Sequence, residues 1–162
     1  MTRGELLANL EAGRRQAESR LTPESLERFG DWSAKDLLFH LAAWQRISGV
    51  QMTARRESGR EASAGEVLGA SLEAAEAERL LALDIDGINA YLFQRYRDQD
   101  WPAALSLWRE SYELLKDEAA RLTDEQLAQL SGGEPLWQRI GWDSFTHVAE
   151  HLGPSRSEQT AS

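Results

Sequence analysis

The sequence predicts an all-α protein, a four-helix bundle with short accessory helices, and two observations carry this prediction. Apolar residues recur at three- and four-residue spacing over several long stretches, which is the period of a helix with one buried face. Strand signals are nearly absent, because the chain has no alternating run of β-branched residues and no Asn-Gly turn. At 162 residues we expect one domain, covering residues 1–152.

Helix-start signals define the first half of the chain. Thr2 and Glu5 fit a capping box, in which a hydroxyl and a carboxylate satisfy the free backbone N–H groups at a helix start. Ser33 and Asp36 repeat the pattern, and a proline at position 23 marks a further start. The expected elements are therefore a helix to about residue 20, a short helical turn through residue 29, and a helix from Ser33 to about Arg56.

The second half begins with a glycine-rich segment, residues 57–70, which we expect to be a mobile connection. The Ala- and Glu-rich segment that follows has high helix propensity. Asp100 followed by Pro102 opens the helix with the clearest apolar stripe in the chain. The expected elements here are a helix over 88–98, one from 101 to about 122, a short one from 123, a turn at 131–135, a last helix ending at Gly153-Pro154, and a disordered tail over residues 153–162.

Composition limits the classes of function. The formal charge of −9 argues against a basic surface for phosphate groups, so we expect no nucleic-acid partner. The absence of cysteine excludes disulfides, thiolate metal sites and a cysteine nucleophile. No apolar run is long enough for a signal peptide or a membrane span, so we expect a cytoplasmic protein without a membrane partner.

The three histidines are the main functional candidates. His147 and His151 are four residues apart, which places both imidazoles on one face of a helix. His40 lies in the apolar stripe of the second helix. Three neutral imidazoles with one open position are a common ligand set for a catalytic metal, so we predict a divalent ion, zinc or nickel, at these residues. The alternatives are a hydrogen-bonded core histidine and a solvent-facing pair at a helix end.

The segment from His147 to His151 also matches the H-x-x-E-H pattern of inverzincin peptidases. Those enzymes need a further acidic ligand far downstream, and only eleven residues follow His151, so we reject this interpretation. Glu150 is still the candidate catalytic residue, as a proton shuttle. The alternative is an outward-facing, solvated glutamate.

Aromatic residues suggest a pocket beside the histidines. Trp44, Trp108 and Tyr112 lie on expected inner stripes, where they either wall a substrate pocket or simply fill the core. Asn89 is placed to direct an amide into such a pocket. The chain has no Ser-His-Asp order, P-loop or G-x-G-x-x-G, so the usual hydride- and phosphoryl-transfer folds have no support.

Four segments resemble the DinB-like four-helix-bundle superfamily. Residues 30–44 resemble its G-x-W-S-x-K-D-x-L-x-H-L-A-x-W signature, and residues 86–90 resemble the D-x-x-N-A of its ClbS/DfsB-type branch. Residues 133–137 and 145–151 resemble the G-x-P-L-W and T-Y-x-H-Y-x-E-H segments of that branch. The resemblance covers nearly the whole chain in the same order. Two departures are Val148, where the branch has an aromatic residue, and the early helix end at Gly153-Pro154.

The resemblance implies a metal site made by one histidine of helix two and two of the last helix, here His40, His147 and His151. Some relatives transfer bacterial thiols, and others open the cyclopropane ring of a reactive natural product. We therefore expect a stress- or resistance-type protein that detoxifies an electrophilic small molecule by hydrolysis, with water activated by a metal or a carboxylate. The alternatives are a protein that sequesters a small molecule without turnover and a thiol-dependent transferase, and the candidate assembly is a homodimer.

Overall fold

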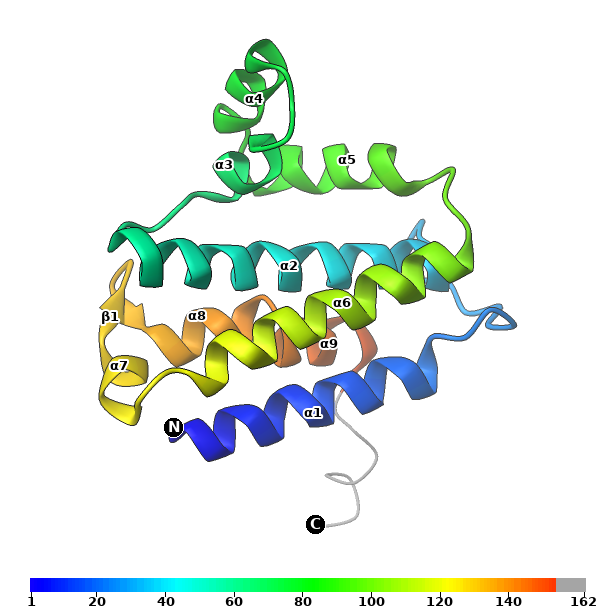
Figure 1. Ribbon diagram of the computed structural model, residues 1–162. Coiled ribbons are helices and arrows are strands. Elements are labelled where there is room, and N and C mark those ends of the chain that lie inside the picture. The colour runs from blue at the N-terminus through cyan, green and yellow to red at the C-terminus, as the bar shows by residue number, and fades with distance from the viewer. Residues whose placement is uncertain (154–162) are drawn as a thin grey trace.

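The computed structural model describes residues 1–153 and is all-α, as predicted, apart from one very short hairpin (Figure 1). The tail expected to be disordered lies outside the described residues except for Gly153. No helix among residues 1–153 is long and apolar enough to cross a membrane.

Three long helices form where the capping signals predict them. Thr2 and Ser33 make the capping boxes with Glu5 and Asp36, and Asp100 accepts a hydrogen bond from the N–H of Ala103. The second helix ends at Gly59, whose φ of 67° is a left-handed conformation that favours glycine. These helices are α1 (Arg3–Arg20), α2 (Ala34–Ser58) and α6 (Trp101–Ala120).

Shorter elements connect and complete them. They are α3 (Ala64–Gly69), α4 (Ala74–Leu81), α5 (Ile85–Tyr96), α7 (Asp124–Ala128), the strands β1 (Leu130–Ser131) and β2 (Glu134–Pro135), α8 (Leu136–Trp142) and α9 (Phe145–Leu152). The two strands pair antiparallel around Gly132 and Gly133, both at positive φ, which is the turn expected at 131–135.

Two sequence-based expectations are wrong. The segment expected to form a short helix through residue 29 has a turn at residues 23–24 and no helix, because no neighbouring surface covers Leu26, which is 94% exposed. The connection expected over 57–70 contains α3, whose start is capped by Ser63 and Glu66. The S-x-x-E pattern of a capping box was present there but was obscured by the surrounding glycines.

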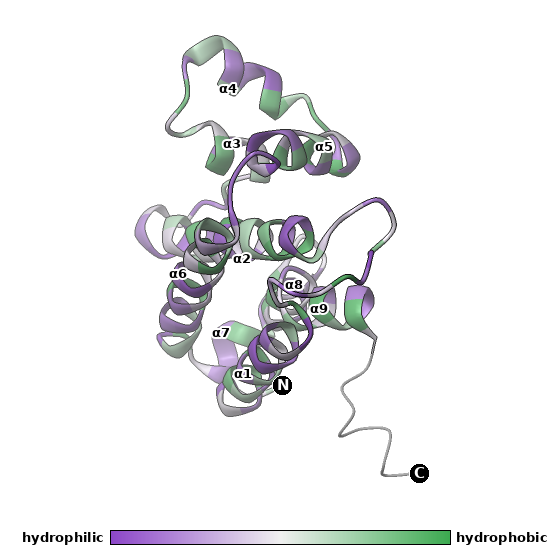
Figure 2. Cartoon of the chain, turned by 90° about the vertical axis from the view of Figure 1, so that its right-hand side faces the viewer, coloured by the Kyte–Doolittle hydropathy of each residue, from purple (hydrophilic) through white to green (hydrophobic). Residues whose placement is uncertain are grey.

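Four segments share the main core. One buried cluster takes Ala17 from α1, Leu38 from α2, Trp108 from α6 and Val148 from α9. Viewed along the helices, α1, α2, α6 and the α8–α9 segment surround this interior, while α5 packs on the outer side of α2 (Figure 2). The α3–α4 pair projects beyond α5 (Figure 1). The interior between α2 and α9 is where the candidate site lies.

Candidate metal centre

All three histidines converge between two helices, as the sequence predicts. His40 comes from α2, and His147 and His151 come from successive turns of α9. One ring nitrogen of each lies within 4.8 Å of the others. The Nε2 atoms of His40 and His147 are 2.9 Å apart. The three imidazoles are therefore close enough to bind one metal ion together.

Local structure positions α9, the helix that carries two of these residues. α8 stops at Trp142 and α9 restarts at Phe145, with the Ser144 hydroxyl donating to the Ile140 carbonyl at the break. α9 then buries Val148 and Leu152, and each of these residues directly follows one of the two histidines. The chain that leads from the turn to the histidines is thus divided into two helices.

Gly13 of α1 holds α9 in place by allowing close approach. A Cβ atom at this position would lie 3.0 Å from the Cα of Phe145, the first residue of α9. A contact of 3.0 Å is tighter than nine in ten real Cβ contacts, so a side chain here would require α1 or α9 to shift by a few tenths of an ångström. The position of the two α9 histidines therefore depends on a residue of the first helix.

Burial keeps the histidine centre uncharged. Burial of the rings, helped by the neighbouring imidazoles, lowers the pKa of His40 to about 3 and that of His147 to about 4. Burial also lowers the pKa of His151, although the Glu150 carboxylate opposes the shift. Neutral imidazoles keep a free lone pair, which is the form that binds a metal.

Ring nitrogens without hydrogen-bond partners are also in keeping with metal binding by the histidines. The Nδ1 atoms of His40 and His147 are buried without a hydrogen-bond partner among the residues described. The Nε2 atoms of the two rings face each other, so at most one proton can lie between these two nitrogen atoms. A divalent ion would instead accept three lone pairs at once, so the donor set fits a zinc-type ion with one open position. Metal-bound imidazoles usually donate through the other nitrogen, and that support is missing from the described residues.

Tryptophans enclose the centre. The Trp32 ring lies 4.5 Å from the His40 ring and 6.1 Å from the His151 ring, between centroids. The Trp44 ring lies 6.5 Å from His147, and its Nε1 donates to Asn89 Oδ1 at 3.0 Å. The structure thus brings Trp44 and Asn89 to the histidines. Trp32 was not among the sequence candidates, because it precedes the α2 cap and lies on no helical stripe.

A pocket with about 240 Å³ of empty space adjoins the centre between α2 and α5. His40 and Asn89 contribute to its wall, and so does Asp36, one turn before His40. The Trp32 and Phe93 rings face this pocket nearly parallel, with an interplanar angle of 10°. The remaining lining residues are Phe39, Leu92, Tyr96 and Arg97.

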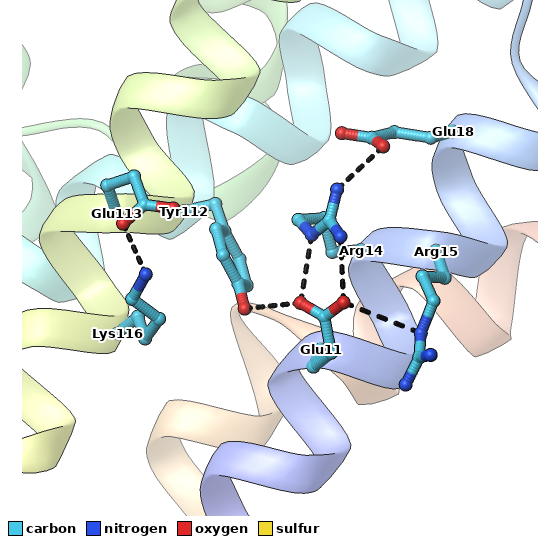
Figure 3. A network of polar contacts seen from close by, with 7 residues as sticks. All are labelled: Glu11, Arg14, Arg15, Glu18, Tyr112, Glu113 and Lys116. Carbon is cyan, nitrogen blue, oxygen red and sulfur yellow. Dashed lines mark hydrogen bonds and ion pairs between the residues drawn. The ribbon is translucent and has the colours of Figure 1, made fainter.

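Two of the aromatic candidates lie elsewhere. Trp108 is completely buried in the main core, and Tyr112 belongs to a second cluster with Leu6 and Leu115. The Tyr112 hydroxyl donates to Glu11 of α1 at 2.7 Å (Figure 3). Neither residue lines the pocket beside His40, so both take the core-packing alternative. Their position on a helical stripe predicts that these side chains are buried, but it does not predict which cavity they face.

Glu150 lies outside this pocket. It is exposed on α9 and does not line the cavity beside His40. Its charge still acts on His151, whose pKa it raises against the effect of burial. This placement favours the alternative of a solvated glutamate over a proton shuttle.

Comparisons with known proteins found no match among family models, curated proteins or solved structures. The resemblance to the DinB-like superfamily therefore rests on the four sequence segments that carry it.

Proposed function

We propose that this chain is a metal-dependent hydrolase of an electrophilic small molecule, of the DinB-like, ClbS/DfsB type. The observation that carries the proposal is the convergence of three neutral imidazoles, one of which also lines a pocket. His40 is that shared residue. A molecule in the pocket would therefore lie next to an ion held by His40, His147 and His151.

A divalent ion bound here would supply Lewis acidity, polarising an electrophile and lowering the pKa of water. Asn89 orients the substrate. Its Oδ1 is occupied by the Trp44 indole, which leaves the Nδ2 hydrogens to donate to an oxygen of the substrate. Trp32 and Phe93 contribute apolar walls that exclude bulk water from the pocket.

Asp36 is the carboxylate that replaces Glu150 in this proposal. It lines the pocket, and its Oδ2 accepts hydrogen bonds from Ser33 N–H and Ser33 O–H at 3.0 and 2.7 Å. Its Oδ1 makes neither of these bonds, so it can accept a proton from the attacking water. The capping box that starts α2 thus also fixes the orientation of the proposed base.

Metal content of untagged protein, purified without chelator, tests the metal site. We expect about one zinc or nickel ion per chain, and loss of the ion in His147→Ala, because one of three ligands is removed. Glu150→Gln is the matched control on the same helix and should retain the metal. Sub-stoichiometric metal that also fails to rise on reconstitution would contradict the proposal.

Binding without turnover is the second candidate, and the aromatic lining favours it. Phe39, Phe93 and Tyr96 offer broad apolar contact for a bound molecule. An electrophilic ligand, such as a strained cyclopropane or epoxide, that quenches tryptophan fluorescence but yields no product by mass spectrometry would support this candidate. Formation of a hydrolysis product that requires the bound metal would support the enzyme.

A further inference from the structure

A second cavity lies at the opposite end of α2, away from the histidines. Its empty space of about 360 Å³ includes volume that is open to solvent. Its walls come from the C-terminal half of α2, the chain around residues 61–62, β1 and α8. None of the three histidines lines it, so it is a site separate from the metal centre.

Two opposite charges, one on α8 and one at its C-cap, line this cavity. Arg139 and Asp143 are one helical turn apart, and both line it. Neither forms an ion pair within 4.0 Å with the other or with any other residue in the described part of the chain. The Ser48 hydroxyl of α2 lies beside the Asp143 carboxylate. Burial raises the pKa of Asp143 to about 7, and Arg139 opposes this shift only in part.

The other charged groups of the cavity are already paired. Arg55 Nη1 lies 2.7 Å from Glu61 Oε1, and the Ser131 hydroxyl donates to the same oxygen at 2.5 Å. Gln51 Nε2 donates to the Ala62 carbonyl at 2.8 Å. These contacts hold residues 61–62 at the cavity. The polar groups that form them are therefore already paired within the protein. The contrast singles out Arg139 and Asp143 as the charges left for a ligand.

The floor of the cavity is apolar. Met52, Leu136 and Ile140 line it, and each is at most 7% exposed. A ligand must therefore match an apolar surface together with one cation and one anion whose charges cancel. An ion of a single sign would satisfy one of the two charges and repel the other.

We propose that this cavity binds a small zwitterion with an aliphatic side chain, an α-amino acid of the leucine type. Its ammonium group pairs with Asp143 and Ser48, its carboxylate pairs with Arg139, and its side chain covers Met52, Leu136 and Ile140. The inference is independent of the metal centre, because no residue of one site belongs to the other.

Three ligands with the same carbon branch test the proposal on wild-type protein. L-leucine carries both charges, 3-methylbutylamine only the cation, and 4-methylpentanoate only the anion. Titration calorimetry at pH 8, where Asp143 is ionised, should show leucine binding at least about tenfold more tightly than either single-charge ligand. Equal affinity of the amine or the acid, or no leucine binding at millimolar concentration, would overturn the proposal.

Isosteric variants assign the two contacts. Asp143→Asn and Arg139→Gln should each weaken leucine binding by about tenfold and bring it to the level of a single-charge ligand. Asp117→Asn and Arg46→Gln change the same residue types at exposed positions and should bind leucine like wild type. Unchanged leucine binding in both α8 variants would overturn the proposal. Metal content is expected to stay unchanged in every variant, so failure here is distinguishable from failure of the metal site.

Discussion

Two polar clusters join distant helices in this protein, and they differ in how completely their groups are paired. Between α1 and α6, Glu11 accepts hydrogen bonds from Arg14 at 2.7 and 2.9 Å and from Tyr112 at 2.7 Å (Figure 3). Arg14 also pairs with Glu18 at 2.7 Å. Between α2 and α9, the buried Nδ1 atoms of His40 and His147 have no partner among the described residues.

The pKa values differ in the same way. Hydrogen bonds from Arg14 and Tyr112 lower the pKa of Glu11 to about 2, so the charge of the α1–α6 cluster is stabilised by its neighbours. In the histidine centre burial lowers the pKa values, which removes charge and leaves lone pairs free. The three hydrogen bonds of the Glu11 carboxylate are sufficiently explained by stability, although Oε1 of the neighbouring Glu18 is buried without a partner among residues 1–153. In the histidine centre the unpaired atoms are neutral imidazole nitrogens, which are common metal ligands and so indicate a binding site.

The largest expected effect is a difference in metal affinity between variants of the two clusters. His151→Ala should weaken zinc binding by at least about 100-fold, since removing a direct ligand costs more than removing an outer partner. Glu11→Gln should leave zinc affinity unchanged. Competition with a chromogenic chelator measures both, and equal affinity in His151→Ala and wild type would show that the imidazoles do not act as a set.

The two clusters should lose their contributions to folding stability over different pH ranges. The folded-state pKa values of His40 and His147 lie below the ordinary 6.5, so the unfolded chain takes up these protons first. Metal-free protein should therefore lose up to about 1.4 kcal/mol per pH unit for each histidine as pH falls from 6.5 toward 4. Glu11, with its pKa lowered from 4.5, stabilises the fold above pH 4.5 and loses this contribution as pH falls toward 2.

Urea unfolding of chelator-treated protein at pH 7 and pH 5 measures the first range. His40→Gln should reduce the pH dependence of the unfolding free energy by the contribution of one proton. Glu11→Gln should leave this pH dependence unchanged between pH 5 and pH 7. A wild-type protein equally stable at both pH values would contradict the picture of neutral, buried imidazoles.

Substitution of Gly13 tests how closely α1 must pack against α9, the helix that carries two of the histidines. Gly13→Ala should destabilise the protein by about 1–3 kcal/mol, because the new methyl group would push against the backbone of Phe145. Gly4→Ala, in the same helix, meets nothing closer than 4.0 Å and should stabilise by up to about 1 kcal/mol through helix propensity. Thermal unfolding of both variants checks the opposite signs; two stabilised variants would show that α9 moves away at no cost.

The smallest expected effect lies in the paired cluster. Tyr112→Phe should cost about 0.5–1.5 kcal/mol, because Glu11 keeps Arg14 when the tyrosine hydroxyl is lost. Combining it with Glu11→Ala, which removes the acceptor, in a double-mutant cycle isolates the shared bond. Additive effects would indicate that the hydroxyl and carboxylate do not interact in solution, and metal content should not change in any of these variants.

Much of the fold could be predicted from local sequence signals. The capping boxes at Thr2, Ser33 and Thr123 start α1, α2 and α7 because their hydrogen bonds span only three residues. The wrong expectation for residues 22–29 has the same origin, since a start signal does not provide the surface that Leu26 would need. Of the candidate site, the three histidines, Trp44 and Asn89 could be predicted from the sequence. Trp32 could not, because it precedes the α2 cap and lies on no helical stripe.

The sequence by itself determined the helices, their buried faces and the three histidines, because periodicity and capping act between residues a few positions apart. Only the tertiary structure decided which atoms meet. His40 and His147 are separated by 107 positions, and Tyr112 and Glu11 by 101, yet no short-range pattern distinguishes the pair that converges on a site from the pair that braces two helices. Helix packing sets those distances, and with them the placement of Trp32 against His40 and of Arg139 and Asp143 in one cavity.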